Sequence, residues 1–548
     1  MCVAGGCVAL AVLIVFAGTL HHGFLWDDEQ FVLKNHFLTS ARFLPQLLTQ
    51  NIVAGAGLVS NLYRPLQSLT HVLDVRLWGY QPWGHHLTNV LLHAAAAVAV
   101  FRLLATLCPV WPAACAALLF ALHPLQSEAV AYVSGRGDTL AMLWLCLGLL
   151  ALGRSTWLAL GCAALGMASK ESLALFPLFA LLYDYARGER IAWRRHWPLW
   201  LLSGAYVVLR LTVFNFNNTL NFYSQPNILT EQPLCRLYTY LTTIPKGLLL
   251  WLWPADLHHE RSWAVFVNPA LPQVWGGALA AAGLLVLAWR CRRRRPVVAA
   301  GILWWFAATL PTSNLVVLIN ALFYDHWFLL PGFGLIMITG AMVSAGWEDR
   351  RAWLRRSVAA GTVLVLAACA LLTWRYNRVW RDPASLYAYI LRWEPRSAKM
   401  HNNLGMAYAD AGRWEDAVRA YRAAIALSDE YPQTHHNLGN VLLQRGEQVA
   451  AAAEFRRTVT MRPDFYQSWM ALGALALQGR RFIEAEEAFA AAVRAYPYEP
   501  HAYLGLAQAR LAQGNTPEAL HAIQDGLHTA PGSASLQEAL RELNPLRK

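Results

Sequence analysis

The chain opens with MCVAGGCVALAVLIVFAGTLHHGFLWDDEQF (1–31), in which no charged residue occurs through Leu20 and three consecutive acids stand at 27–29. An apolar run of about 20 residues is long enough to cross the hydrocarbon layer of a membrane. The run lacks the basic start of a signal peptide, so we expect it to remain as a first membrane helix. The acids then leave this span within about two helical turns. They are either a solvated stop to the helix or part of a catalytic centre at the membrane surface.

The apolar character of this first segment recurs along most of the chain. Of the 548 residues, 56% are hydrophobic and only 14% are charged, and the mean hydropathy is +0.31. An ordinary globular core cannot enclose so much apolar surface, so we predict an all-α, polytopic membrane helix bundle. The apolar segments are 2–20, 87–107, 110–122, 138–153, 156–169, 172–185, 197–214, 238–254, 274–289, 297–311, 326–347 and 357–374.

Basic clusters orient these segments, because Lys and Arg concentrate in cytoplasmic loops. The clusters are ARGERIAWRRH (186–196), RCRRRR (290–295) and EDRRAWLRR (348–356). All of them reach the cytoplasm only if 238–254 does not cross fully, and a re-entrant or interfacial segment would satisfy this. We therefore predict about 11 spans, a cytoplasmic amino terminus, a first outer loop at 21–86 and an extracytoplasmic carboxyl terminus.

Under this topology, separate charged junctions share the outer face of the membrane. They are WDDEQ (26–30), HPLQSEAVAYVSGRGD (123–138), SKES (169–172) and NALFYDHW (320–327). Charged side chains at the edge of a membrane bundle are usually functional or paired with one another. We expect these junctions to meet in space and to form the candidate site.

The carboxyl-terminal part of the chain has a period of 34 residues. The repeating positions are Leu404, Leu438, Leu472 and Leu506; Ala417, Ala451, Ala485 and Ala519; Pro395, Pro463, Pro497 and Pro531; and Gly405, Gly439 and Gly473. This period is the signature of tetratricopeptide repeats, which pair two helices per repeat and stack into an α-solenoid. We assign 1–376 to the membrane domain, 377–397 to a partial leading repeat or linker, and 398–548 to an array of about four repeats.

Arrays of this kind bind extended segments of other proteins. The repeating leucines and alanines are core residues. Candidates for a concave binding surface are Tyr408, His435, His436, Asn437 and Asn440.

Within the membrane domain, Asp27 or Asp28 is the candidate general base, since a carboxylate so placed can take a proton from a hydroxyl nucleophile. Arg64 is a planar, permanently charged donor suited to a phosphate. Lys170 could neutralise a phosphate leaving group, although a lysine at a span end also snorkels to the membrane surface.

Several polar residues near the outer face have competing structural explanations. His86, Asn89 and His93 begin the second span, and with His85 they make a metal site conceivable. No carboxylate or thiolate stands at ligand spacing, however, so helix capping or hydrogen bonding is the alternative that we favour.

The same ambiguity holds for the remaining candidates for substrate binding, which are His123, Glu128, Arg136, Asp138, Glu171, Asp325 and His326. Glu128 and Arg136 could pair with each other instead, and Asp325 could simply suit the dipole at the start of a helix. Arg210 lies inside an apolar segment and needs a partner.

The motifs of other protein classes are missing from the sequence. There is no P-loop, Rossmann fingerprint, Gly-x-Ser-x-Gly or zinc-protease motif. No nucleic-acid-binding motif accompanies the net charge of +12. A lipid-linked donor delivered by the membrane needs none of these motifs, whereas a nucleotide-sugar donor in the cytoplasm is disfavoured.

The sequence resembles the transmembrane and TPR-containing protein O-mannosyltransferases, within the wider GT-C type of glycosyltransferases that use polyprenyl-phosphate sugars. The resemblance covers nearly the whole chain. It is carried by the acidic pair followed by Asn35, by YRPL (63–66), HLTNVLLH (86–93), the 123–138 and 169–172 junctions, and the repeat array. One departure is FYDHW (323–327), where an acid–arginine pair is expected. This departure leaves the identity of the sugar open.

The resemblance implies that Asp27 or Asp28 activates a Ser or Thr hydroxyl of an acceptor protein held by the repeats. A single displacement at the anomeric carbon inverts its configuration and releases polyprenyl phosphate, with Arg64, Arg136 and Lys170 as candidates to stabilise the phosphate. The sugar would be mannose or another hexose. The short array suggests a bacterial-type protein, located in the inner membrane with the repeats in the periplasm. A divalent metal is conceivable, but no sequence pattern supports one.

Two other functions remain open from the sequence alone. A non-catalytic membrane scaffold for an envelope complex needs only the repeat array and treats the acids as topology signals. A transporter of a lipid-linked sugar would be favoured by internal symmetry among the spans, and none is visible.

Overall fold

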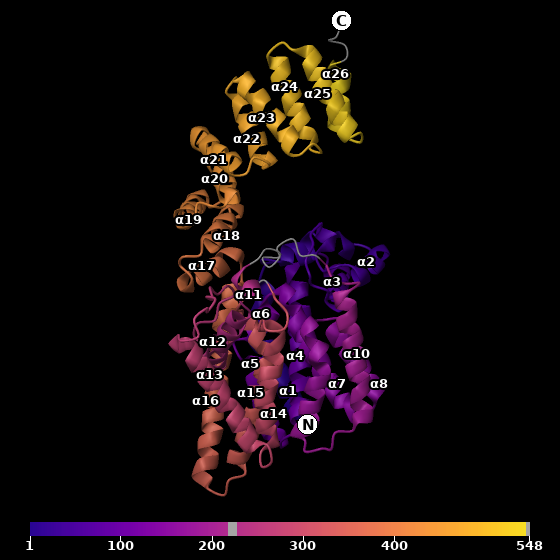
Figure 1. The fold of residues 1–548 in the computed structure, drawn as a ribbon, viewed down its shortest axis with the longest axis vertical. Coiled ribbons are helices and arrows are strands. Elements are labelled where there is room, and N and C mark those ends of the chain that lie inside the picture. The colour runs from indigo at the N-terminus through magenta and orange to yellow at the C-terminus, as the bar shows by residue number, and fades with distance from the viewer. Residues whose placement is uncertain (217–226, 320, 544–548) are drawn as a thin grey trace. The chain divides into compact units, whose positions relative to one another are not determined.

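The structure is a computed structural model that describes residues 1–216, 227–319 and 321–543. These residues form two compact units, Met1–Tyr389 and Ile390–Lys548, and helices are the only regular elements among them (Figure 1). The all-α prediction is therefore confirmed. The boundary between the units falls inside the segment 377–397 that was assigned to a linker. Asn320, at the start of one predicted junction, lies outside the described residues.

The first unit combines long helices with short ones. Its α-helices are α1 (Cys2–Phe16), α2 (Leu44–Thr49), α3 (Pro65–Trp78), α4 (Pro82–Leu104), α5 (Val110–Leu122), α6 (Gln126–Ala131), α7 (Arg136–Leu152), α8 (Thr156–Met167), α9 (Phe176–Ala186), α10 (Trp193–Leu211), α11 (Ile228–Glu231), α12 (Pro233–Leu252), α13 (Pro272–Cys291), α14 (Pro296–Thr309), α15 (Leu329–Trp347), α16 (Ala352–Asn377) and α17 (Pro383–Trp393), the last of which crosses the unit boundary. Single helical turns that matter below are η1 (Ala17–His21), η2 (Glu29–Leu33), η6 (Val133–Gly135), η7 (Glu171–Leu175), η9 (Asp325–Phe328) and η10 (Arg378–Trp380).

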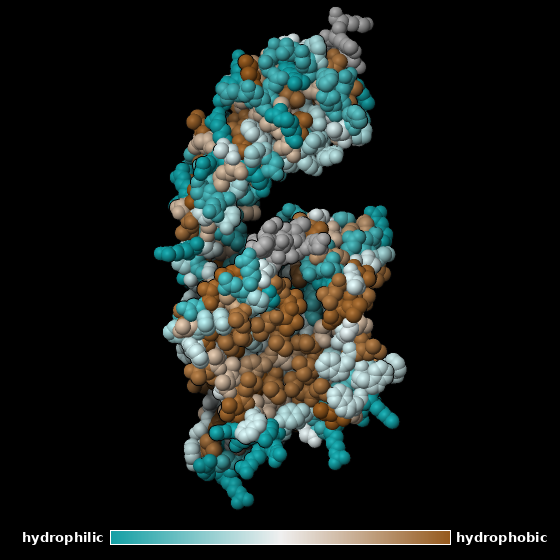
Figure 2. Space-filling view, viewed as in Figure 1, coloured by the Kyte–Doolittle hydropathy of each residue, from teal (hydrophilic) through white to brown (hydrophobic). Residues whose placement is uncertain are grey.

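Six helical stretches of this unit are long and apolar enough to cross a membrane. They are Cys2–His21, Pro82–Leu104, Val133–Leu152, Pro272–Cys291, Asp325–Trp347 and Ala352–Trp380, and shorter apolar helices cover Val110–Leu122, Thr156–Met167 and Pro296–Thr312. Hydrophobic residues form a broad band over these helices, with hydrophilic residues beyond its borders (Figure 2). The chain is an integral membrane protein, and the predicted 11 crossings stay a prediction.

The segment 238–254, which the charge map kept from crossing, lies mainly within α12. This helix runs through Pro245 without interruption and is in neither group of apolar helices. It packs closely on α13, because a Cβ on Gly277 would stand 2.1 Å from the backbone oxygen of Leu241. The Tyr240 hydroxyl also lies 2.7 Å from Thr309 Oγ1 at the end of α14. The helix α12 is thus an integral member of the bundle.

The core of the bundle joins small and aromatic side chains. Ala97 of α4 and Ala117 of α5 are fully buried, and small residues of this kind let membrane helices approach closely. Trp304 of α14 fills the opposite side, stacked on Phe179 at 4.3 Å between ring centroids, and its indole N–H donates to the Leu330 carbonyl at 3.1 Å. This rigid core holds the ends of the helices, where the charged residues lie.

The second unit consists of antiparallel helix pairs at the predicted period. The pairs are α18 (Ala398–Asp410) with α19 (Trp414–Leu427), α20 (Pro432–Gln444) with α21 (Gln448–Met461), α22 (Tyr466–Gln478) with α23 (Phe482–Ala495), and α24 (Pro500–Ala512) with α25 (Thr516–Thr529), and α26 (Ala534–Leu543) follows. The four predicted repeats are confirmed.

The glycines that recur every 34 residues in this unit have a steric cause. A Cβ on Gly405 would stand 2.7 Å from the Tyr421 ring, one on Gly439 would stand 2.7 Å from the Phe455 ring, and one on Gly473 would stand 2.8 Å from the Phe489 ring. Each of these three repeats therefore presses an aromatic ring of its second helix onto a glycine of its first helix.

We predict that Gly473→Val destabilises the second unit by about 2 kcal/mol, because overpacking costs roughly 1–3 kcal/mol. Hydrogen–deuterium exchange of the full-length protein, followed over residues 466–495, should show faster exchange in the variant. The matched control is Gly532→Val, since a Cβ there meets no atom within 4 Å. Equal exchange in both variants would show that the ring does not press on Gly473.

Candidate functional site

The charged junctions of the membrane unit meet at one end of the bundle. Figure 1 shows α2, α3, α6 and α11 at the end of this unit away from the amino terminus. The Asp28 carboxylate accepts a hydrogen bond from the Ser134 N–H at 2.7 Å, Lys170 pairs with Asp138, and His326 Nδ1 lies 2.5 Å from Glu128 Oε1. These contacts tie each of the other predicted junctions to the segment 123–138. Their predicted convergence is confirmed.

Asp28 is an internal anchor of the first outer loop. Its side chain is fully buried. Oδ1 accepts hydrogen bonds from the N–H and the hydroxyl of Ser134, at 2.7 and 2.6 Å, and Oδ2 accepts one from the Leu25 N–H at 2.9 Å. With these donors satisfied inside the protein, Asp28 fastens the loop to the turn that precedes α7.

Asp27 is less buried than its neighbour. It is only partly buried, and it follows Trp26, whose φ of +48° is unusual for a bulky residue. The Asp27 N–H donates to the Tyr132 hydroxyl at 3.0 Å. Burial, followed by the charges of Asp27 and Asp28, raises the pKa of Tyr132 well above its ordinary value. Asp27 is therefore the acid of the pair that stays partly accessible to solvent.

The burial of Asp28 leads to a pH-dependence prediction. Burial raises the pKa of Asp28 from 3.8 to about 7, although its hydrogen bonds oppose this shift. Between about pH 4 and pH 7 the folded protein then holds a proton on Asp28 that the unfolded chain has released, so the free energy of unfolding falls as the pH rises through this window. The Asp28→Asn variant lacks this ionisation but presents an N–H₂ group to a backbone donor, which costs about 1–3 kcal/mol.

We expect the wild type to exceed Asp28→Asn in thermal stability most strongly at pH 5, and the difference to shrink by pH 8. Thermal unfolding in detergent, followed by tryptophan fluorescence at both pH values, measures the two differences. A difference that is constant with pH would show that the pKa of Asp28 is not raised.

Glu128 stands at the centre of a histidine pair. Its Oε1 lies 2.8 Å from His259 Nδ1 and 2.5 Å from His326 Nδ1. Burial alone would raise the pKa of Glu128, but the contacts with His326 and His259 hold it well below its ordinary value. Burial lowers the pKa of His259, but the Glu128 carboxylate, with smaller effects of Glu260 and Asp27, raises it above its ordinary value. The alternative pairing of Glu128 with Arg136 is not what forms.

Asp325 forms an ion pair with Arg261, which is distant from it in sequence. Its Oδ1 accepts from Arg261 Nε and its Oδ2 from Arg261 Nη2, both at 3.0 Å, and Oδ2 also accepts from the His258 N–H at 2.9 Å. A second acid, Asp256, pairs with Arg261 at 3.4 Å and with Lys246 at 2.5 Å. Asp325 thus has an arginine partner, which comes from another segment of the chain.

The segment DLHHERSW (256–263), which supplies His259 and Arg261, was not among the sequence-based candidates. It lies between α12 and α13, outside every junction that the charge map placed at the outer face. The available signal was its density of titratable residues directly after a long apolar segment.

Arg64 and Lys170, the candidates for phosphate binding, lie in adjacent ion pairs. Arg64 Nε lies 3.1 Å from Glu171 Oε2, and the side chain of Arg64 is 16% exposed. Lys170, paired with Asp138, is 13% exposed. Each cation is paired with one carboxylate and keeps a small exposed fraction, so either can exchange its carboxylate partner for an anionic ligand.

Arg136, the other predicted phosphate ligand, is fully enclosed. Its Nη2 lies 2.5 Å from Asp74 Oδ2, and its Nε donates to Asn89 Oδ1 at 2.6 Å. Further bonds go to Thr70 Oγ1 and to the His85 carbonyl, both at 3.1 Å. Arg136 is 0% exposed, so it links α3, α4 and α7 and offers no face to a ligand in this structure.

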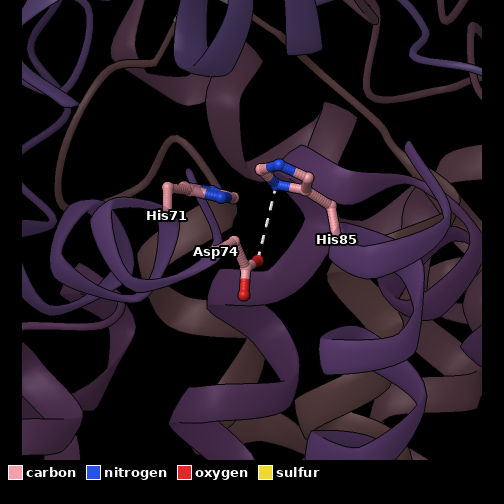
Figure 3. A group of neighbouring side chains, drawn as sticks. All are labelled: His71, Asp74 and His85. Atoms are coloured by element: carbon pink, nitrogen blue, oxygen red, sulfur yellow. Dashed lines mark ion pairs between the residues drawn. The ribbon is translucent and has the colours of Figure 1, made fainter. Parts of the chain in front are cut away.

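Next to Arg136, two histidines flank the same aspartate. Figure 3 shows the rings of His71 and His85 near Asp74, with an ion pair to His85, in which His85 Nδ1 lies 3.4 Å from Asp74 Oδ2. Sequence spacing alone does not place a carboxylate beside His85; the fold does so, because Asp74 of α3 lies next to His85 of α4. Burial, and then the positive charge of Arg136, lowers the pKa of His71 well below its ordinary value.

The remaining candidate residues form hydrogen bonds between segments of the bundle. His86 Nε2 lies 3.4 Å from the Gly23 carbonyl, His93 Nε2 lies 3.0 Å from the Ala121 carbonyl, and His123 Nε2 lies 3.0 Å from the Trp251 carbonyl. The amide of Asn89 donates to the carbonyls of Val130 and Tyr132, at 3.2 and 3.1 Å. Hydrogen bonding, the favoured alternative for His86, Asn89 and His93, is what the structure shows.

Arg210 and His435, two further residues noted in the sequence, both have polar partners in the structure. Arg210 Nη2 donates to the Asn61 carbonyl at 2.6 Å, so its charge is stabilised at the loop before α3. In the repeat array, His435 pairs with Glu454 and Asp429, both at 2.7 Å.

Comparison with known proteins agrees with this architecture. The family described as TPR repeat matches residues 405–446, and the family described as tetratricopeptide repeat matches residues 436–500 and 476–543. The chain is 39% identical over 154 residues to the protein O-mannosyl-transferase Tmtc1 of Drosophila melanogaster, covering 27% of this chain and 18% of that protein.

Longer matches at lower identity extend over parts of both units. The human protein O-mannosyl-transferase TMTC1 is 24% identical over 506 residues, covering 77% of this chain and 55% of that protein. The mouse protein O-mannosyl-transferase TMTC4 is 26% identical over 493 residues, covering 76% of this chain and 65% of that protein. The chain spans less than two thirds of the length of these curated relatives.

Proposed function

We propose that this TMTC-like, TPR-containing membrane protein is a protein glycosyltransferase that transfers a hexose to Ser or Thr hydroxyls at the extracytoplasmic face. The observation that carries the proposal is the position of Asp27, a partly exposed acid on a tightly held turn where the charged junctions converge. Similarity to proteins named protein O-mannosyl-transferases supports the reaction class. The donor proposed is a polyprenyl-phosphate sugar, because the bundle lies in the membrane and the sequence has no nucleotide-binding motif.

Asp27 serves as the general base in this mechanism. As the acceptor oxygen forms a bond to the anomeric carbon, its proton passes to the Asp27 carboxylate, and the bond from that carbon to the phosphate oxygen breaks. One displacement inverts the configuration of the anomeric carbon. Asp28, buried and hydrogen-bonded by three donors, keeps the loop in the geometry that Asp27 requires.

The phosphate leaving group needs positive charge near its departing oxygen. Arg64 and Lys170 supply it, since both lie at the same end of the bundle and each is held by an acid from another segment. A planar guanidinium suits two phosphate oxygens at once, whereas the ammonium group acts as a point charge. Arg136 has no such role in this proposal because its donors are used inside the bundle.

The TPR array engages the acceptor protein. Stacked repeats present a continuous concave surface to an extended segment of a partner. Placing the acceptor on the array raises its concentration at the membrane unit, so that a short-lived encounter with Asp27 suffices for transfer.

The proposal is tested with the full-length protein in proteoliposomes that contain mannosyl polyprenyl phosphate and a Ser/Thr-rich acceptor polypeptide. Intact mass spectrometry should show hexose additions on the acceptor, and these additions should be missing when a nucleotide-sugar is supplied instead. Hexose transfer from the nucleotide-sugar alone would overturn the lipid donor. The lack of transfer from either donor, together with a stable stoichiometric complex formed through the repeats, would support a scaffold.

A further inference from the structure

We propose that Glu128, His259 and His326 form a binding site for a divalent transition-metal ion of the zinc class. One carboxylate oxygen and two imidazole nitrogens, all within 4.8 Å of one another, come from separate parts of the chain. Glu128 lies in α6, His259 in the segment between α12 and α13, and His326 in η9. Segments this distant in sequence bring their ligand atoms to a common point only in the folded bundle.

The types of ligand atom, two nitrogens and one oxygen, indicate which class of ion fits the site. Zinc is bound by imidazole nitrogens at about 2.0–2.1 Å and by carboxylate oxygens at about 2.0–2.2 Å, whereas magnesium and calcium favour ligand sets made of oxygen. Two histidines and one glutamate are a ligand set of catalytic zinc sites, which leave a fourth position for water or an anionic oxygen.

The distances are compatible with a bound ion. Tetrahedral ligands at these bond lengths lie about 3.3 Å apart. Glu128 Oε1 is 2.8 Å from one nitrogen and 2.5 Å from the other, so each of these two contacts must lengthen by less than about 1 Å to admit an ion. Rotation of the Glu128 carboxyl group provides a movement of this size.

A second observation is the state of His326. Its Nδ1 is buried and lies 2.5 Å from the Glu128 carboxylate oxygen, so the nitrogen faces the same oxygen as His259 Nδ1 does. The side chain of His326 is 20% exposed, which leaves a route by which an ion can enter.

The surroundings hold the ligand rings in place. The His259 ring packs edge-on against Trp26, with 4.8 Å between centroids, and lies 5.9 Å from Tyr132 and 5.8 Å from Tyr324. The charges of Glu260 and Asp27 also act on His259. These acids give the site a negative potential that attracts a cation, and the nearby charge of Arg261 is offset by its bidentate bond to Asp325.

A second histidine–carboxylate group of the membrane unit has the opposite character. His71, Asp74 and His85 are also close enough to share an ion, but the Arg136 guanidinium lies 2.5 Å from Asp74 Oδ2. A metal ion there would face a fixed positive charge at the oxygen that it needs. That group is a buried ion-pair network, and it supplies an internal comparison for the proposed site.

The metal site has a consequence that rests on the proposed function. Trp26, which packs on His259, precedes Asp27 directly. One ligand of an ion on Glu128, His259 and His326 would therefore pack against the residue next to Asp27, the candidate base. Its open position would accept an oxygen of the donor phosphate. Metal binding itself is measured without any assay of sugar transfer, so failure of one proposal is distinguishable from failure of the other.

The experiment uses the full-length protein in detergent, stripped with EDTA and titrated with Zn²⁺, with bound metal measured by inductively coupled plasma mass spectrometry. We expect one tightly bound ion per chain. Glu128→Gln and His259→Asn should each weaken binding by more than about 100-fold, since even partners of metal ligands contribute roughly 10–100-fold. His71→Asn and the exposed His528→Asn should keep the wild-type affinity.

Replacement with Co²⁺ tests the site without any variant, which matters if a ligand variant fails to fold. The wild type should show the visible bands of a tetrahedral nitrogen–oxygen site and no thiolate charge-transfer band from the nine free cysteines. The proposal is overturned by a lack of tight binding, by a thiolate spectrum, or by loss of binding in His71→Asn with retention in Glu128→Gln.

Discussion

The Asp27→Asn variant should lose sugar transfer by about 10²–10⁴-fold in kcat, which is the usual contribution of a general base. The expectation rests on the proposed reaction, in which the acceptor proton passes to the Asp27 carboxylate. Asn has nearly the same shape but cannot accept that proton. The backbone N–H of Asp27 can still donate to the Tyr132 hydroxyl in the variant, so this anchor of the turn should be kept. Transfer rates in proteoliposomes and thermal unfolding in detergent measure the two properties separately.

Glu29→Gln is the matched control, because Glu29 is the next acid but one along the same loop. Its side chain is 49% exposed and pairs with Lys34 on the surface, so its loss should leave transfer unchanged. Asp28→Asn does not replace this test, since it disturbs the hydrogen bonds of Leu25 and Ser134. Full activity of Asp27→Asn in a correctly inserted protein would remove Asp27 from the chemistry.

The difference between the two aspartates shows what sequence can and cannot predict at this site. Their position after an apolar segment predicts that both lie at the membrane surface, and the structure adds that Asp28 is fully buried while Asp27 is partly exposed. Which carboxylate points inward depends on the turn at Trp26 and on a partner, Ser134, more than a hundred residues away in sequence. Neither feature leaves a local pattern, so the roles of Asp27 and Asp28 could be assigned only from the fold.

The repeat array and its period were predictable, because each repeat contacts only its neighbours and its spacing is visible along the sequence. The membrane unit is different. Its charged groups pair across helices, as Glu128 does with His259 and Asp325 does with Arg261. A search for pairs along one helix face finds His71 and Asp74, but cannot add Arg136 from α7. The ion pairs between distant segments of this unit therefore could not be predicted from its sequence.

The largest effect on stability is expected from Asp74→Asn. Asp74 is 2% exposed and balances the fully buried Arg136 guanidinium, with Oδ2 at 2.5 Å from Nη2. Removing one partner of a buried ion pair costs about 3–5 kcal/mol, because it leaves an uncompensated charge in the interior. The Thr88 hydroxyl also loses the negative charge of its acceptor, Asp74 Oδ1, at 2.6 Å. We expect the thermal midpoint in detergent to fall by roughly 5–10 °C.

A double variant separates the charge from the packing in this prediction. Replacing both partners, as in Asp74→Leu with Arg136→Met, removes the uncompensated charge and should recover much of the loss, since apolar substitutes for a buried pair are often neutral. Asp349→Asn is the control for an ion pair at the surface, where Arg351 is 61% exposed, and should leave the midpoint unchanged. If Asp74→Asn behaves like this control, water reaches Arg136, and α3, α4 and α7 do not depend on a dry ion pair for their association.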